Sequence, residues 1–183
     1  TGKTVFMRTT LIPWQGNERR FSIAADINPY ISHDMAENNV IFREVMANDV
    51  IAIGMREANP DVGLQKMLEK IGHSLQAERV LIFEEQGSRV SATYEWHQED
   101  LPPIAHTVQH IPLNSLRPLY DAFDAKQMAI IEDAQDFIQK HPGFHAHIPG
   151  IYRLVSGHLT QSGKSLGFTE VINPSALAFK SAG

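Results

Sequence analysis

The 183-residue chain contains no cysteine. Disulfide bonds, thiolate metal sites and cysteine nucleophiles are therefore excluded, and the composition suits a reducing compartment. No apolar run approaches the roughly 18–20 residues that a bilayer-spanning helix needs, and no signal peptide is visible. We therefore expect a cytoplasmic protein with no membrane partner within this chain.

Basic residues are also few and scattered. The chain has 16 lysines and arginines against 21 aspartates and glutamates, which gives a formal net charge of −5, and its longest basic run is Arg19-Arg20. Such a chain has no field that would attract nucleic acid, so we expect no nucleic-acid partner. Hydrophobic residues make up 43% of the sequence, which is enough to build the core of one good-sized domain.

Sequence motifs of enzymes are missing as well. The chain has no G-x-S-x-G nucleophile elbow and no H-E-x-x-H zinc motif. The run Gly163-Lys164-Ser165 resembles the end of a phosphate-binding loop, but His158 stands where the upstream glycine is needed, and the run falls in a hairpin turn. We therefore expect no catalytic residues and interpret the chain as not itself an enzyme.

Nine histidines raise the hypothesis of a metal site. In an extended segment His145 and His147 would share one face. His141 lies four residues before His145, and Asp133 or Asp136 could complete a ligand set. A Pro-Gly pair bounds the stretch on each side, which favours a polar loop with exposed histidines instead. We expect no native metal.

Two runs of alternating residues open the chain. Residues 5–11 and 20–27 flank the turn-forming stretch 13–17, which indicates a β-hairpin. A lone hairpin is marginal in water, so we expect that the rest of its sheet lies upstream. The first residue, Thr1, is not methionine, and we interpret the chain as a piece of a longer protein.

A long helix is expected over about residues 32–57. Ser32 could cap it, and Gly54 lies near its end. Apolar residues recur in it at mixed three- and four-residue steps: Met35, Ile41, Phe42, Val45, Met46, Ala52 and Met55. Such a stripe suits a linker helix that pairs with its copy in a homodimer, or one that packs on the neighbouring domain.

The stretch Asn59-Pro60-Asp61 marks the start of another helix, with Asn as N-cap, Pro at the first position and Asp favoured by the helix dipole. This helix is expected to end near Leu75. Beyond it the sequence predicts a hairpin over 79–96, an irregular middle with short helices, a strand over 128–132, a helix over 134–140 and a closing hairpin over 152–172. Because hairpins join most of these strands, we expect an α+β fold with an antiparallel sheet.

Both ends of this region resemble a GAF domain. Residues 71–84 and 93–96 look like the first helix and hairpin of that family. Its last hairpin is matched by Leu159, Gly163, Leu166-Gly167-Phe168, Val171 and Asn173-Pro174. More narrowly, the match is similar to the GAF domains of bacterial multidomain signalling proteins that carry a diguanylate cyclase output. Similar sequences often end Val-Asp-Asn-Pro, whereas Ile172 stands here in place of the acid, so no role of that carboxylate is carried over.

The opening segment resembles another family. Residues 7–14 and 20–27 look like the last two strands of a PAS domain, which often hands over to the next module through a helical linker. The two resemblances divide the chain into a PAS-like C-terminal hairpin (1–28), a helical linker (29–60), a GAF-like sensor domain (61–174) and a tail that leads to a downstream domain (175–183).

The resemblance also implies where a ligand would lie, because GAF domains hold theirs between the sheet and the irregular middle. The residues that could line such a pocket are Phe83, Tyr94, Trp96, Tyr120, Phe123, Ile131, Asp133 and Tyr152. Several of them could instead be core. No cofactor is implied, and because the chain lacks cysteine it cannot hold a bilin covalently as photosensory relatives do.

Two functions from different classes remain open. The first is a sensory module that binds a small ligand, or relays a signal, through helix 32–57 to a downstream output domain. The second is a ligand-free structural or dimerisation domain. A buried cavity lined by Tyr94 or Trp96 would favour the first, and a filled core the second; a small-molecule enzyme is the least supported reading.

Overall fold

The computed structural model describes residues 5–14, 17–26, 48–125, 127–142, 144 and 148–175. In chain order its elements are β1 (Val5–Trp14), β2 (Asn17–Asp26), a helical stretch over residues 48–56, α2 (Pro60–Leu75), β3 (Arg79–Gln86), β4 (Arg89–His97), the 3-10 helix η1 (Ala105–Thr107), β5 (Ile111–Pro112), the 3-10 helix η2 (Leu113–Leu116), α3 (Arg117–Ala122), β6 (Met128–Ile131), α4 (Ala134–Lys140), β7 (Leu154–Gln161) and β8 (Lys164–Ile172).

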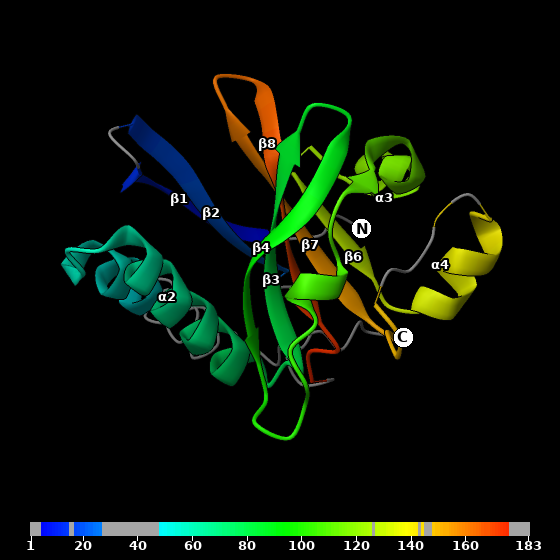
Figure 1. Cartoon of the computed structure of the whole chain (residues 1–183), viewed down its shortest axis with the longest axis horizontal. Coiled ribbons are helices and arrows are strands. Elements are labelled where there is room, and N and C mark those ends of the chain that lie inside the picture. Colours follow the sequence, from blue (N-terminus) through cyan, green and yellow to red (C-terminus); the bar gives the residue numbers. More distant parts are fainter. Residues whose placement is uncertain are drawn as a thin grey trace, which may run out of the picture.

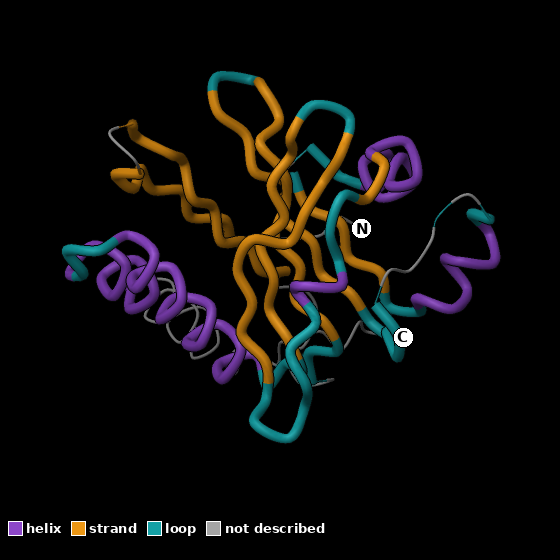
Figure 2. The backbone as a smooth tube through the Cα atoms, viewed as in Figure 1, coloured by secondary structure: helices purple, strands orange, loops and turns teal. Residues whose placement is uncertain are grey.

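Six of the strands form one antiparallel sheet in the order β5-β4-β3-β8-β7-β6. The hairpins β3–β4 and β7–β8 meet at its centre, where β3 pairs with β8. Figure 1 and Figure 2 show α2 on one side of this sheet and α3 and α4 on the other. The predicted α+β class with an antiparallel, GAF-like sheet is confirmed.

Helix α2 begins and ends as its sequence predicts. The side chain of Asn59 accepts a hydrogen bond from the backbone N–H of Asp61, Pro60 occupies the first turn, and Gln76 closes the helix in the left-handed conformation at φ 48°. It packs on β3 and β4. Its apolar stripe belongs to a core that also includes residues of β7 and β8: Leu64, Met67, Leu68, Ile71, Val80, Ile82, Val155 and Val171.

Two glycines let the helical stretch 48–56 approach α2 closely. A Cβ on Gly54 would lie 2.3 Å from the sulfur of Met67, and a Cβ on Gly63 would lie 3.0 Å from the backbone oxygen of Gly54. Val50 is fully buried in the same core. The predicted long helix is therefore confirmed over residues 48–56, while its earlier part lies outside the described residues.

The opposite face of the sheet carries a second and larger core. Leu81, Phe83, Val90, Phe168 and Ile172 project into it from the central strands. Leu116 and Leu119 cover it from the η2–α3 segment, and the residues that follow α4 complete it with Phe144, Ile148 and Ile151. This face lies between the sheet and the irregular middle of the chain.

The opening strands pair as the predicted hairpin, with Val5 opposite Asp26 and Trp14 opposite Asn17. Strand β2 lies against β7, so the hairpin meets the main sheet on the side of α2 (Figure 1). Among the described residues, no helix is both long enough and apolar enough to cross a membrane.

Candidate functional site

A small cavity lies between the sheet and the segment that contains α3 and α4. Its volume is about 30 Å³, and apolar side chains line it almost completely, among them Phe83, Leu116, Ile131, Phe137 and Phe168. The exception is Glu170, which lines the same cavity.

Glu170 is an unusual group for this position. It lies in β8 opposite Leu81 of β3 and Ser156 of β7, at the centre of the sheet, with 6% of its surface exposed. Burial raises the pKa of its carboxyl group to about 8, since the apolar surroundings disfavour the charged form. At pH 7 the group is therefore mainly neutral.

The predicted pocket residues divide between the two faces of the sheet. Phe83 and Ile131 do line the cavity. Tyr120 and Phe123 pack against the same core at its edge, 5.7 Å apart between ring centroids. Asp133 is instead the N-cap of α4, accepting a hydrogen bond from the backbone of Asp136 at 2.9 Å.

Three predicted residues lie away from the cavity. Tyr152 is 52% exposed. Tyr94 and Trp96 point to the other face of the sheet, where Tyr94 donates a 2.6 Å hydrogen bond to Asp61 and Trp96 packs on Gly72 of α2. The cause is a β-bulge in β4: Ile82 pairs with Tyr94 but Phe83 pairs with Ala92, so the extra residue reverses which side chains face the cavity.

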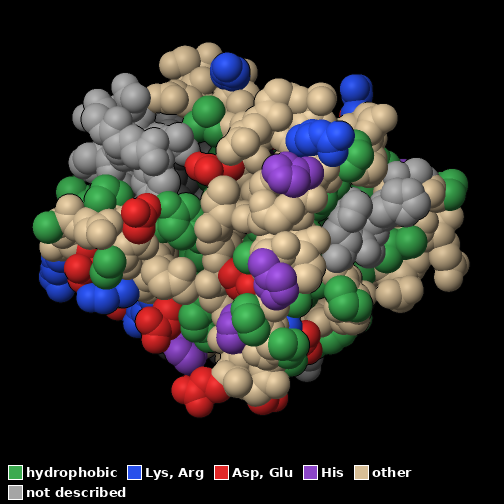
Figure 3. Space-filling view, viewed as in Figure 1, with side chains coloured by type: hydrophobic (Ala, Val, Ile, Leu, Met, Phe, Trp, Pro, Cys, Tyr) green, Lys and Arg blue, Asp and Glu red, His purple; other side chains and the backbone are tan. Residues whose placement is uncertain are grey.

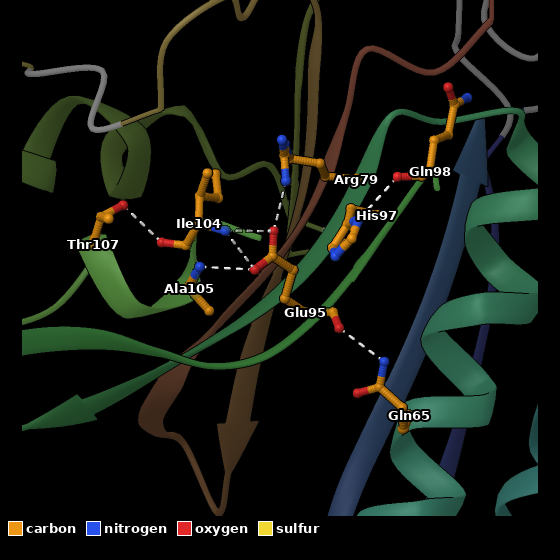
Figure 4. Close-up of polar contacts among 8 residues, drawn as sticks. All are labelled: Gln65, Arg79, Glu95, His97, Gln98, Ile104, Ala105 and Thr107. Carbon is orange, nitrogen blue, oxygen red and sulfur yellow. Dashed lines mark hydrogen bonds and ion pairs between the residues drawn. The ribbon is translucent and has the colours of Figure 1, made fainter. Parts of the chain in front are cut away.

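The bulge also turns Glu95 into the large core. Its carboxylate pairs with Arg79 at 2.7 Å and accepts backbone hydrogen bonds from Ile104 at 2.8 Å and Ala105 at 2.7 Å, as Figure 4 shows. Both charged side chains are less than one-tenth exposed. Because all its acceptor sites are used inside the protein, Glu95 fixes the start of η1 against the sheet and is not available to a ligand.

A chain of polar side chains crosses the edge of the large core. His158 contacts Gln127 through Nδ1 at 2.7 Å and Ser165 through Nε2 at 2.8 Å. Ser165 in turn donates to Glu85, which also accepts a 2.6 Å hydrogen bond from the hydroxyl group of Tyr120. Strands β3, β7 and β8 and helix α3 are thereby joined through one hydrogen-bonded network.

The network resembles a nucleophile beside its base, because Ser165, His158 and Gln127 follow one another at hydrogen-bond distance. Desolvation lowers the pKa of His158, against an opposing pull from Glu85. The Ser165 hydroxyl, however, donates its hydrogen bond to the carboxylate of Glu85. In acyl transfer a negative charge develops on the carbonyl oxygen of the substrate, and the carboxylate would repel that charge. Burial and Glu85 also raise the pKa of Tyr120, which keeps its hydroxyl a donor. The arrangement holds elements together.

Asn173 explains the Asn-Pro pair that ends β8. Its amide group donates to Glu78 at 2.7 Å and to the carbonyl of Gly150 at 3.0 Å, and its side-chain oxygen accepts from the backbone of Tyr152 and Arg153. The residue is 3% exposed and has φ 51°, a left-handed conformation that asparagine tolerates well. It fastens the loop before β7 to the end of the sheet.

A wider hollow of about 850 Å³ opens at the surface beside α3. Its two guanidinium groups already have partners, since Arg117 pairs with Asp121 at 2.8 Å and Arg89 donates to the carbonyl of His110. On the face drawn in Figure 3, acidic, basic and histidine side chains of the described residues are interspersed.

The described part of the chain contains no group of three or more histidine, aspartate or glutamate side chains placed to hold a metal ion. Of the residues considered for such a site, His145 and His147 lie outside the described residues. Asp136 pairs with Lys140 at 2.6 Å on the surface of α4.

Sequence reasoning missed the two most informative groups of this face. Glu170 stands in the run from Gly167 to Ile172, and the signal was present: a carboxylate at the position where alternation with Phe168 and Ile172 demands an inward side chain. No local pattern in the sequence indicates the network of Glu85, Ser165 and His158, because its members lie up to 80 residues apart.

No protein-family model matches the chain. A search of curated proteins gives no match either.

Solved structures do resemble it. The chromophore-binding domain of a Stigmatella aurantiaca bacteriophytochrome superimposes with a TM-score of 0.59 at 14% identity, over 91% of this chain and 65% of that one. The GAF domain of an Acinetobacter phosphoenolpyruvate-protein phosphotransferase gives 0.54 at 14% identity, over 73% and 79% of the two chains. The free methionine-R-sulfoxide reductase of Neisseria meningitidis gives 0.53 at 13% identity, over 73% of each.

These likenesses show that the chain has the GAF fold. At such identities they show the fold alone. The chain spans 65% of the length of the bacteriophytochrome domain.

Proposed function

We propose that this chain is a sensory module of a bacterial signal-transduction protein, which binds a small ligand and relays the signal to a downstream output domain. The fold supports this proposal, since it is shared with a phytochrome domain that binds a chromophore. The observation that carries it is the cavity between the sheet and α3 and α4, where the neutral, buried Glu170 faces apolar side chains. Apolar walls with one convergent polar group are the usual lining of a small-molecule site, and a ligand larger than the present space would enlarge it by displacing side chains.

The proposed relay path runs from β4 of the sheet to the linker helix through close contacts. Glu95 on the cavity side and Trp96 on the α2 side are neighbours in β4, so a shift of this strand moves both. Trp96 packs on Gly72 of α2, where an added Cβ would lie only 2.0 Å from the indole ring. Because α2 meets the helical stretch 48–56 at Gly54, a movement of β4 reaches the linker through packed contacts.

The neighbouring domains and the cellular location are proposed from the sequence resemblance to PAS and GAF domains of bacterial signalling proteins. The hairpin β1–β2 ends a PAS domain upstream, the parent protein is cytoplasmic, and its output domain is a diguanylate cyclase. The sequence that follows Gly183 in the parent tests the last point directly: a cyclase signature supports it, and an unrelated domain refutes that output while leaving the sensory role intact.

The linker helix forms the dimer in this proposal. Met55 supports it, because this residue lies in the helical stretch 48–56 with 64% of its surface exposed, opposite the buried Val50. We expect the substitution Met55→Glu to convert a homodimer into a monomer without unfolding it, since a charge at a helix–helix seam is left desolvated. Sedimentation velocity over a wide concentration range, with circular dichroism for the fold, is the measurement.

The matched control is Arg56→Glu, which adds an acid at the next position, also exposed. It should leave the dimer intact. A wild-type chain that sediments as a monomer at every concentration contradicts the dimeric relay.

The second candidate is a ligand-free structural domain, and one observation favours it. The cavity of about 30 Å³ has room for only about two water molecules, so most of the inner face is filled. In this case the domain transmits movement without binding anything. A screen in which no small molecule perturbs the side chains around the cavity would favour this alternative.

A further inference from the structure

Among the described residues, Glu170 has no partner that explains its burial. The described residues offer it no hydrogen bond and no ion pair, although every other carboxylate in the large core has one or more. Its neighbour Ser156 donates its hydroxyl group to the backbone carbonyl of Thr169 instead. An unpaired polar group in an apolar interior costs stability. A carboxyl group kept at this position can therefore receive a partner that the described residues do not supply.

The titratable groups on the same face as Glu170 already have other partners. Arg79, which projects from β3 on the same face, is paired with Glu95. Tyr120 of α3 donates to Glu85, and His158 of β7 contacts Ser165. The side chain therefore presents a neutral carboxyl group to the cavity, with one O–H donor and one carbonyl acceptor side by side.

We propose that Glu170 is the polar recognition group of this cavity, and that the ligand is a small neutral molecule with a primary amide or lactam group on an apolar body. This inference rests on the proposed sensory function and gives it a ligand class. An amide presents an adjacent donor and acceptor, which complement a neutral carboxyl group through two hydrogen bonds in one plane.

The rest of the cavity fits the apolar body of such a molecule. The space of about 30 Å³ accepts the amide head in place of about two waters. A larger body displaces the half-buried side chains of Phe137 and Ile138, which α4 places over the cavity. An amine or a carboxylate of the same size is disfavoured, because either would bring a charge into an apolar site with no compensating ion.

The cavity carries its own reporters, since Ile131, Ile138, Ile148 and Ile151 all line it. We expect propionamide to shift the methyl resonances of these isoleucines in a saturable manner at pH 6.5. Propylamine and propionate, which match it in size, should bind at least about tenfold more weakly, as expected from the loss of one or two hydrogen bonds and the added charge.

Two variants separate recognition by Glu170 from simple filling of an apolar space. Glu170→Gln keeps a donor beside an acceptor and should bind propionamide as the wild type does. Glu170→Leu should bind it at least about tenfold more weakly. The surface substitution Glu99→Gln is the matched control and should change nothing.

A titration of the wild type gives a test that needs no variant. Propionamide affinity should fall as the pH rises through the pKa of Glu170, about 8, because the ionised carboxylate has no proton to donate. Equal affinity at pH 6.5 and pH 9.5 overturns the inference, and so does equal binding to Glu170→Leu or a cavity whose isoleucines respond to none of the probes.

The failure of this inference is distinguishable from the failure of the proposed function. A ligand that changes the dimer without touching the cavity isoleucines refutes the role of Glu170 and leaves the sensor intact. Propionamide that binds in the cavity of a chain that never dimerises supports the role of Glu170 and refutes the dimeric relay.

Discussion

Glu95 and Glu170 are two buried carboxyl groups on the same face of one sheet, but their surroundings differ. Glu95 meets Arg79 and two backbone N–H groups. Glu170 meets apolar side chains and a small cavity. Glu95 is therefore compensated by partners inside the protein, whereas Glu170 is tolerated because it is neutral.

This difference predicts a pH dependence of stability. The pKa of Glu170 rises from 4.5 to about 8 on folding, so between these values the folded state holds a proton that the unfolded state has lost. The contribution of Glu170 to the free energy of unfolding should thus be largest below pH 4.5 and fall by up to about 1.4 kcal/mol per pH unit until pH 8. Urea denaturation across this range measures it.

The substitution Glu170→Gln should remove this slope, and Glu99→Gln should preserve it. The lowered pKa of His158 acts with the opposite sign, because its contribution is lost only as the pH falls below 6.5. The difference between the wild-type and Glu170→Gln curves therefore isolates Glu170. Parallel curves would show that Glu170 is charged in the folded state.

At the scale of the elements, the contact of Gly72 with Trp96 couples α2 to β4. A Cβ at Gly72 would overlap the indole ring at 2.0 Å. We expect Gly72→Ala to destabilise the fold by about 2 kcal/mol, even though alanine favours a helix by about 1 kcal/mol over glycine. Thermal and urea unfolding measure the change.

A double-mutant cycle supplies the control for this contact. In a Trp96→Leu background the space above Gly72 is open, and the same substitution to alanine should be neutral or stabilising. An equal loss in both backgrounds would mean that the glycine is needed for some other reason.

Much of this architecture could be predicted from the sequence, because local signals determine it. The caps of α2 and the turns at Gly87 and Gly163 fix the helix and the two central hairpins. The short strand β5 and the 3-10 helices were not predicted, since their two to four residues carry no periodicity.

The candidate site could be predicted only in part, because a single bulge decides it. Strict alternation along β4 would place Tyr94 on the face of Val90, and the register shift beside Phe83 reverses this. Phe83 and Ile131 lie in the cavity because β3 and β6 are regular where they contribute. The polar network at Glu85 joins distant segments and is invisible to any local pattern.

At the scale of the whole molecule, the cavity lies on one side of the sheet and the linker helix packs on α2 on the other side. The connection runs through β4, α2 and the helical stretch 48–56, each packed on the next through a glycine. A sensory module of this kind can pass a signal only if its linker helix contacts a second copy of the chain, since the movement of an isolated helix changes no interface.

The most direct test is the distance between two copies of the linker, measured by pulsed electron paramagnetic resonance. Because the chain has no cysteine, Asn48→Cys in the exposed part of helix 48–56 can carry a unique spin label. The account predicts one dominant inter-subunit distance that shifts when propionamide fills the cavity. The absence of any inter-subunit signal, or a distance unchanged by a probe that the cavity isoleucines show to be bound, would contradict it.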